Sequence, residues 1–173
     1  MKTAHYIVDV SSITSLEEGF AAFEKDFEGK LDICVPCAGI NRNLSFLETS
    51  FEEHQKLVGI NVMGVYHTAQ LAAKVMIRNG TRNGSIVLVA SIASYMAIRS
   101  QMSSAYCGTK GAVRAMCPAI AAELNEYVSL CILQEEGDTN IPSKGYSCQQ
   151  YLAWICKNGD DCAFPSSAGK LEG

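Results

Sequence analysis

The sequence predicts an open α/β sheet of parallel strands, and three observations support that prediction. Short β-branched segments alternate with longer segments whose apolar residues recur at helical spacing. The order strand, helix, strand repeats through residues 6–133, and this order is typical of parallel crossover units. Residues 85–90 are apolar without alternation, which indicates a strand buried on both faces.

The first strand is expected at residues 6–10, a short apolar segment that ends at a pair of serines. An amphipathic helix is expected to follow over residues 16–27, because its leucine and phenylalanines recur at helical spacing. Ser15 and Glu18 have the spacing of a capping box at its start, and Gly29 is expected to end it.

A second strand is expected at residues 31–35, before the glycine-bearing loop 36–40. Residues 50–78 then form a long helix that is apolar over most of its circumference. A helix of this kind should be covered on two sides, so we expect the sheet on one side and a second subunit on the other.

The third strand, at residues 85–90, is followed by a helix that Ser103 or Ser104 can cap and that runs to about residue 126. A fourth strand is expected at residues 128–133. Pro118 lies inside the last helix, where it removes a hydrogen bond and collides with the preceding turn. It therefore predicts a kink or an early stop.

The composition is that of a globular protein, with 48% apolar and 18% charged residues in 173. A net charge of −4 and the lack of a basic run argue against a nucleic-acid partner. No apolar stretch approaches membrane-spanning length and the start does not resemble a secretion signal, so we expect no membrane contact and a cytoplasmic location. Glycine, serine and cysteine dominate after residue 133, which predicts a domain over 1–133 and a loosely packed or disordered tail over 134–173.

Eight cysteines are present, and we expect four of them to be reduced thiols that pack as small apolar groups, namely Cys34, Cys107, Cys117 and Cys131. Cys34 and Cys37 have the spacing of a redox dithiol or a zinc half-site, and this remains an alternative function. The histidines show no metal-ligand spacing, so we expect no metal site.

Tyr106 and Lys110 are the candidates for proton transfer. They lie four residues apart, so a helix would present phenol and ammonium to the same small volume, where the positive charge lowers the tyrosine pKa. Ser91 follows a buried strand and could hold a substrate oxygen beside them. A solvated helix face is the alternative reading of the pair, and a simple turn serine is the alternative for Ser91.

Several motifs, in this order, resemble the classical short-chain dehydrogenase/reductase family across residues 6–133. They are Asp9-Val10 at a strand end, Leu31-Asp32-Ile33 before Ala38-Gly39, Asn61 in Asn-x-x-Gly, Ser91 after its strand, and Tyr106-x-x-x-Lys110-Gly111. The fifteen residues from Ser91 to Tyr106 look like the fungal sorbose reductase and arabinitol dehydrogenase branch.

The resemblance implies a Rossmann-like, doubly wound parallel sheet that is incomplete here. The chain begins at what looks like the family's third strand, so we expect a truncated start without the first βαβ portion and its glycine-rich turn. Residues 134–142 only faintly resemble the family's Pro-Gly turn, and the rest of the tail diverges.

The resemblance also implies roles for four residues. Tyr106 is the general acid in carbonyl reduction or the base in alcohol oxidation, and Ser91 binds the substrate oxygen as negative charge develops. Lys110 lowers the tyrosine pKa and binds the nicotinamide ribose, while Asn61 holds a water that connects the lysine to solvent. The alternative for Asn61 is a helix-interior amide bonded to a neighbouring strand.

The implied cofactor is NADP or NAD, with NADP favoured by the resemblance. Asp9 would meet the adenine, and the backbone of Cys37, Ala38 and Gly39 would line the adenosine side. Lys56 lies at a position that is often basic in the family and would contribute to the cofactor site. The residue that selects between the two cofactors belongs to the absent portion.

We therefore expect an NAD(P)-dependent oxidoreductase that acts on a small carbonyl or alcohol substrate, and a truncated start would leave it inactive. The alternative is a catalytically silent interaction subunit that pairs through helices 50–78 and 104–126. In both cases we expect a homo-oligomer that uses these helices.

Overall fold

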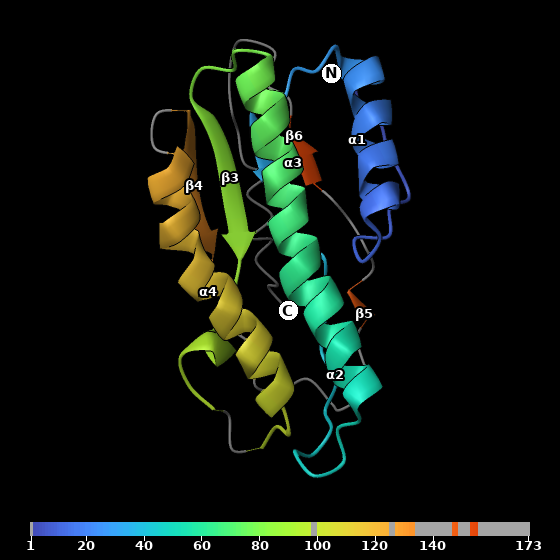
Figure 1. The fold of residues 1–173 in the computed structure, drawn as a ribbon, viewed down its shortest axis with the longest axis vertical. Coiled ribbons are helices and arrows are strands. Elements are labelled where there is room, and N and C mark those ends of the chain that lie inside the picture. The colour runs from blue at the N-terminus through green and yellow to red at the C-terminus, as the bar shows by residue number, and fades with distance from the viewer. Residues whose placement is uncertain (1, 98–99, 125–126, 134–146, 149–152, 156–173) are drawn as a thin grey trace, which may run out of the picture.

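A layer of helices on one sheet is the architecture of this protein. The computed structural model describes residues 2–97, 100–124, 127–133, 147–148 and 153–155 (Figure 1). The main sheet has the order β4-β3-β1-β6. Its strands are β1 (Ile33–Val35), β3 (Gly84–Val89), β4 (Val128–Leu133) and β6 (Ala153–Ile155). The first three run parallel to one another, and β6 runs antiparallel to β1.

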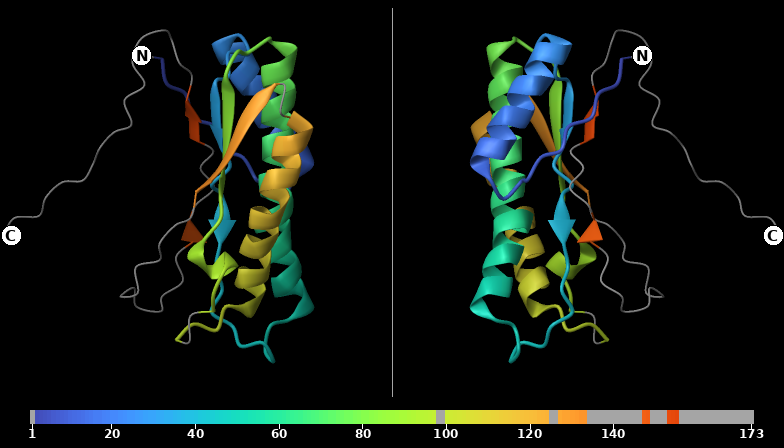
Figure 2. Two further views of the ribbon diagram at one scale, coloured as in Figure 1. Left: turned by 90° about the vertical axis from the view of Figure 1, so that its left-hand side faces the viewer. Right: turned by 90° about the vertical axis from the view of Figure 1, so that its right-hand side faces the viewer.

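The three long helices lie on the same side of this sheet, as the two side views show (Figure 2). They are α1 (Ile13–Phe27), α3 (Val65–Arg78) and α4 (Ser104–Leu124). The connections β1-α3-β3 and β3-α4-β4 both step in the same direction across the sheet. Because such crossovers are right-handed, the two helices must share a face. The parallel α/β class predicted from the sequence is confirmed.

Helix α1 begins at a different residue from the one predicted. Ser12 is the N-cap, and its side chain accepts a hydrogen bond from the backbone N–H of Ser15. The predicted capping box at Ser15 is wrong, because the Ser15 hydroxyl oxygen accepts the backbone N–H of Asp9 instead. The helix ends just before Gly29, as expected, and both Glu28 and Gly29 are in the left-handed region.

The strand predicted at residues 6–10 is also wrong, because this segment forms no strand. In the described sheet the edge of β1 away from β3 is paired with β6, so it offers no free backbone groups to a strand at residues 6–10. Val8 and Val10 are nevertheless buried, and they pack in a small cluster with Leu16 and Ile60. The apolar pattern thus indicated the burial of Val8 and Val10 correctly, but these residues are buried without forming a strand.

The long helix predicted over residues 50–78 is continuous in extent but changes type. It consists of α2 (Phe51–Val58), a π-helical turn over Gly59–Gly64, and α3. The side chain of Ser50 caps α2 by accepting the N–H of Glu53. A π-turn inserts extra chain into a helix, so residues on either side of it point in different directions.

The main core lies between the helices and the sheet. Its large, fully buried side chains come from α1, α3, β3 and the segment before β1, and they include Phe23, Leu31, Met76, Ile86 and Leu88. Helix α4 continues past Pro118, so the predicted early stop is wrong. Pro118 and Arg114 are both exposed, so water can reach the carbonyl group that loses its partner.

Two short strands fall in the region predicted to be a divergent tail. One is β6, and the other is β5 (Ser147–Cys148), which pairs antiparallel with β2 (Gly39–Ile40). Neither was predicted. The expected loose packing of residues 134–146, 149–152 and 156–173 lies outside the described residues.

The close contact between the π-turn and the N-terminal segment yields a test. A Cβ atom at Gly64 would lie 2.9 Å from Val10 Cγ2 and 3.1 Å from the Val10 backbone oxygen. Gly64→Ala should therefore lower the free energy of unfolding by about 1–3 kcal/mol in urea titrations. Gly59→Ala is the matched control, because nothing lies within 4 Å of a Cβ there. An unchanged midpoint for Gly64→Ala would contradict this packing.

Candidate active site

Asn61 is a fully buried amide in the π-turn, and it bonds to a neighbouring strand. Its Oδ1 accepts the backbone N–H of Ile40 at 2.9 Å, and its Nδ2 donates to the Ile40 carbonyl oxygen at 2.9 Å. The amide thus makes the same two hydrogen bonds to Ile40 that a residue of a neighbouring antiparallel strand would make. These are the bonds of the alternative given for Asn61, an amide bonded to a strand, and its expected contact with a water stays a prediction.

Lys110 is a buried cation beside Tyr106 on α4. Its residue is only 4% exposed, and its Nζ donates to the carbonyl oxygen of Val89 at 2.8 Å. The same Nζ lies 5.9 Å from the centre of the Tyr106 ring. The expected shared face of the two residues is thus present, and the solvated-face alternative does not hold for Lys110.

Ser91 lies two residues beyond Val89, just past the carboxyl end of β3. It caps a 3-10 helix over Ile92–Ser94 by accepting the backbone N–H of Ala93 at 3.2 Å. This short helix packs against α4. A cation–π contact between Arg114 and Tyr95 at 4.1 Å further fixes the loop to that helix.

Gly39 lies next to both polar side chains. A Cβ atom there would be 3.4 Å from Asn61 Oδ1 and 3.8 Å from Lys110 Nζ. The glycine therefore keeps its side of the Asn61–Lys110 pair free of a side chain. Ala38 before it is buried, and Cys37 is half-buried.

Asp9 and Lys56 are exposed, in contrast to the buried Asn61 and Lys110. The Asp9 carboxylate accepts hydrogen bonds from the backbone N–H and the hydroxyl of Ser11. Lys56 lies in the last turn of α2. For both residues the expected cofactor contact stays a prediction.

Thr109 is a site residue that the sequence motifs did not identify. It is 2% exposed and lies between Tyr106 and Lys110, where its hydroxyl contacts the Asn61 amide. The one sequence feature that points to Thr109 is a hydroxyl side chain on the expected buried face of a helix. This feature does not reveal its bonding partner, because Asn61 lies far away along the chain.

Cys34 is unsuited to the dithiol chemistry that its spacing suggested. It is fully buried in the main core, and that burial raises the pKa of its thiol above the ordinary range, with a further contribution from Cys37. Thiolates are the reactive form, so Cys34 is held in its unreactive form. Among the described residues, no group of three or more His, Cys, Asp or Glu side chains could hold a metal ion.

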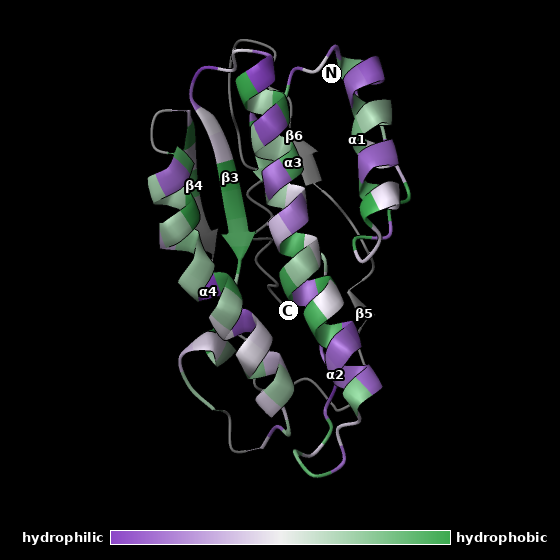
Figure 3. Cartoon of the chain, in the orientation of Figure 1, coloured by the Kyte–Doolittle hydropathy of each residue, from purple (hydrophilic) through white to green (hydrophobic). Residues whose placement is uncertain are grey.

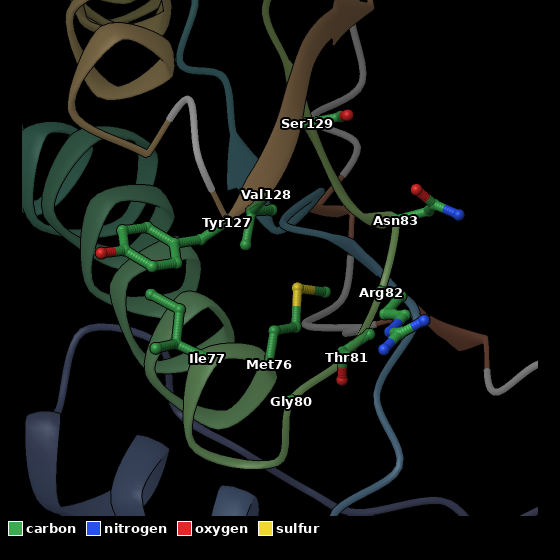
Figure 4. Close-up of a pocket in the computed structure, with 9 residues that line it drawn as sticks. All are labelled: Met76, Ile77, Gly80, Thr81, Arg82, Asn83, Tyr127, Val128 and Ser129. Atoms are coloured by element: carbon green, nitrogen blue, oxygen red, sulfur yellow. The ribbon is translucent and has the colours of Figure 1, made fainter.

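A cavity of about 470 Å³ lies at the amino ends of the parallel strands, away from Ser91 (Figure 4). It is lined by Met76, Ile77, Gly80, Thr81, Arg82, Asn83, Tyr127, Val128 and Ser129. Met76 and Ile77 lie near the end of α3 and the other lining residues stand where β3 and β4 begin, whereas Ser91 follows the end of β3. Ligands of open parallel sheets bind at the carboxyl ends, so the candidate site is the cluster around Asn61 and Lys110.

None of the described helices is long and apolar enough to cross a membrane.

The family model of short chain dehydrogenases matches residues 1–134. An uncharacterized oxidoreductase of Schizosaccharomyces pombe is 29% identical over 123 residues, covering 71% of this chain and 46% of the relative. Gluconate 5-dehydrogenase of Gluconobacter oxydans is 29% identical over 163 residues, covering 91% of this chain and 60% of the relative.

A solved structure shows a similar level of sequence identity to this chain. Gluconate 5-dehydrogenase of Burkholderia cenocepacia, in complex with NADP and tartrate, is 29% identical with a TM-score of 0.66. The match covers 73% of this chain and 48% of that one. The chain thus spans about half the length of the relatives it matches.

The burial of Cys34 predicts a selective labelling pattern. In the native protein at pH 8, iodoacetamide should modify the half-buried Cys37 at least tenfold faster than Cys34, because a raised pKa and full burial both suppress the thiolate. Peptide mass spectrometry at several times would measure the two rates. In concentrated urea the rates should become similar, which is the control. Equal native rates would restore the dithiol hypothesis.

Proposed function

The chain belongs to the short-chain dehydrogenase/reductase family, and we propose that its cluster around Tyr106 transfers protons during nicotinamide-dependent oxidation or reduction. The reaction is the interconversion of a small carbonyl compound and its alcohol. Tyr106 gives a proton to the carbonyl oxygen in reduction and takes it back in oxidation. Tyr106, Lys110, Ser91 and Asn61 have the roles in this proposal that the family resemblance implies.

The observation that carries the proposal is the buried ammonium of Lys110 beside the phenol of Tyr106, at 5.9 Å from the ring centre. A cation near a phenolate stabilises its negative charge, and burial strengthens this by lowering the local dielectric constant. The Val89 carbonyl holds Nζ in place at 2.8 Å. The proton donor therefore has a fixed charge next to it.

Ser91 supports the proposal through the hydrogen bond that it accepts. Its oxygen already receives the Ala93 N–H, so its own hydrogen can be directed to another acceptor. A substrate oxygen that gains negative charge as the hydride arrives is such an acceptor. Ser91 would thus fix the reacting oxygen between itself and Tyr106.

The residues present fit the ribose end of a nicotinamide cofactor. Lys110 supplies ammonium hydrogens, and Gly39 leaves a space beside Nζ that a Cβ would occupy at 3.8 Å. When bound, the cofactor supplies or accepts the hydride. We assign Asp9 to the adenine and the backbone of Cys37, Ala38 and Gly39 to the adenosine side, and Lys56 contributes to the cofactor site.

NADP or NAD is the proposed cofactor, with NADP favoured. The Burkholderia cenocepacia relative was solved with NADP, and that observation belongs to the relative. Within the family we keep the fungal sorbose reductase and arabinitol dehydrogenase branch as the proposed assignment, on the fifteen-residue interval before Tyr106. We also propose the division into a domain over 1–133 and a tail over 134–173, and a cytoplasmic location.

Replacement of Tyr106 tests the proposed chemistry. Tyr106→Phe removes the proton donor and keeps the ring, so kcat for a carbonyl substrate should fall about 10²–10⁴-fold. NADPH affinity, measured by calorimetry or fluorescence, should stay within threefold of the unchanged protein. Tyr66→Phe on the exposed face of α3 is the control and should retain activity. Absence of NADPH and NADH binding at millimolar concentration would overturn the proposal.

A second candidate function is a silent subunit that pairs through the helices of residues 50–78 and 104–126. The observation that favours it is the exposed side of these helices, which carries Phe51, Met63, Tyr66 and Ile77. On α4 the outward side is largely apolar to neutral in hydropathy (Figure 3), and Ala115 and Ala119 are exposed there. Small residues let two helices approach closely. An oligomer of this kind is also compatible with the enzyme.

A charge on α4 tests the pairing. Ala119→Arg should shift the protein toward the monomer in light scattering, because it places a cation in the proposed contact. Ala21→Arg on the exposed face of α1 is the matched control and should not change the mass. A monomeric unchanged protein would exclude the pairing while leaving the enzymatic proposal open.

A further inference from the structure

Thr109 connects three elements through one hydroxyl group. Its Oγ1 donates a hydrogen bond to the carbonyl oxygen of Tyr106 at 2.8 Å. The same oxygen accepts a hydrogen bond from Nδ2 of Asn61 at 3.1 Å. The chain of bonds thus runs from the π-turn through Thr109 to the backbone of the proposed proton donor.

The chemistry of the Asn61 amide explains why a hydroxyl is needed at this position. Nδ2 carries two hydrogens, and one of them is used on the Ile40 carbonyl at 2.9 Å. The second hydrogen reaches Thr109, and both residues are almost completely buried. Without an acceptor at residue 109, this hydrogen would be buried and unpaired.

We propose that Thr109 is a positioning residue that fixes the first turns of α4 against the π-turn. The proposal rests on the proposed function, because its purpose is to hold Tyr106 and Lys110 in register. Helix α4 begins at Ser104, so Tyr106 lies close to the helix end, where helices fray. An anchor inside the first turns suppresses this fraying.

A second hydrogen bond fixes the rotation of α4 about its own axis. Lys110 bonds to Val89 on β3, and Thr109 bonds to Asn61 on the π-turn. Neighbouring residues of a helix point about 100° apart, so the two bonds hold α4 from two directions. A helix held in this way cannot turn about its axis, and the Tyr106 ring keeps its place relative to the Lys110 ammonium.

Three variants of Thr109 test the proposal. Thr109→Val keeps the shape and removes the hydroxyl, Thr109→Ser keeps the hydroxyl, and Thr109→Ala replaces the valine variant if that one does not fold. Hydrogen exchange of the Ile40 amide is the first readout, because this N–H donates to Asn61 Oδ1. We expect the Ile40 amide to exchange at least tenfold faster in the valine variant and at the normal rate in the serine variant.

Steady-state kinetics with NADPH and a carbonyl substrate are the second readout. Thr109→Val should lower kcat about ten- to hundredfold, the range expected for losing a buried hydrogen bond. KM and NADPH affinity should stay within threefold, because Thr109 touches neither molecule in this proposal. Thr109→Ser should restore kcat.

Thr68→Val is the matched control, since Thr68 is equally buried but lies on α3. It should leave both the Ile40 exchange rate and kcat unchanged. A normal Ile40 exchange rate in Thr109→Val, or an equal loss in Thr109→Ser, would overturn the proposal. If the unchanged protein neither binds NADPH nor turns over substrate, the proposed function fails, and the exchange experiment still decides the role of Thr109.

Discussion

The pairing of the Asn61 side chain with the backbone of Ile40 is the interaction on which the candidate site depends. The amide completes the hydrogen bonds of a two-residue strand, and a buried backbone group without a partner would destabilise the fold. The same amide reaches α4 through Thr109. One side chain therefore holds β2, the π-turn and the helix with Tyr106 and Lys110 together.

The π-turn carries both contacts that join this helix to its surroundings. Asn61 bonds to Ile40 from within the turn, and Gly64 at its end packs closely on Val10. Irregular helical turns of this type occur often at functional sites, and here the turn buries a polar residue whose bonding groups are satisfied by protein.

Local features of the site were predictable from the sequence, and distant ones were not. The shared face of Tyr106 and Lys110 follows from helical spacing alone. The missing strand at residues 6–10 depends on β6, which lies more than a hundred residues further along the chain. The helix over 50–78 looked apolar all round, but its buried residues lie mostly in the π-turn and α3, and Phe51 and Met63 are exposed. Thr109 could not be identified because its bond to Asn61 spans 48 residues.

The long spacing of these bonds has a consequence for the order of folding. The bonds from Asn61 to Ile40 and from Lys110 to Val89 each close 21 residues, and the bond to Thr109 closes 48. The parallel pairing of β1 with β3 closes an even longer stretch, since Ile33 lies opposite Ser85. Closing such loops loses chain entropy that local helices do not lose. We therefore expect the helices to form before both the sheet and the polar cluster, so a partly folded chain can be helical while it lacks an ordered catalytic centre.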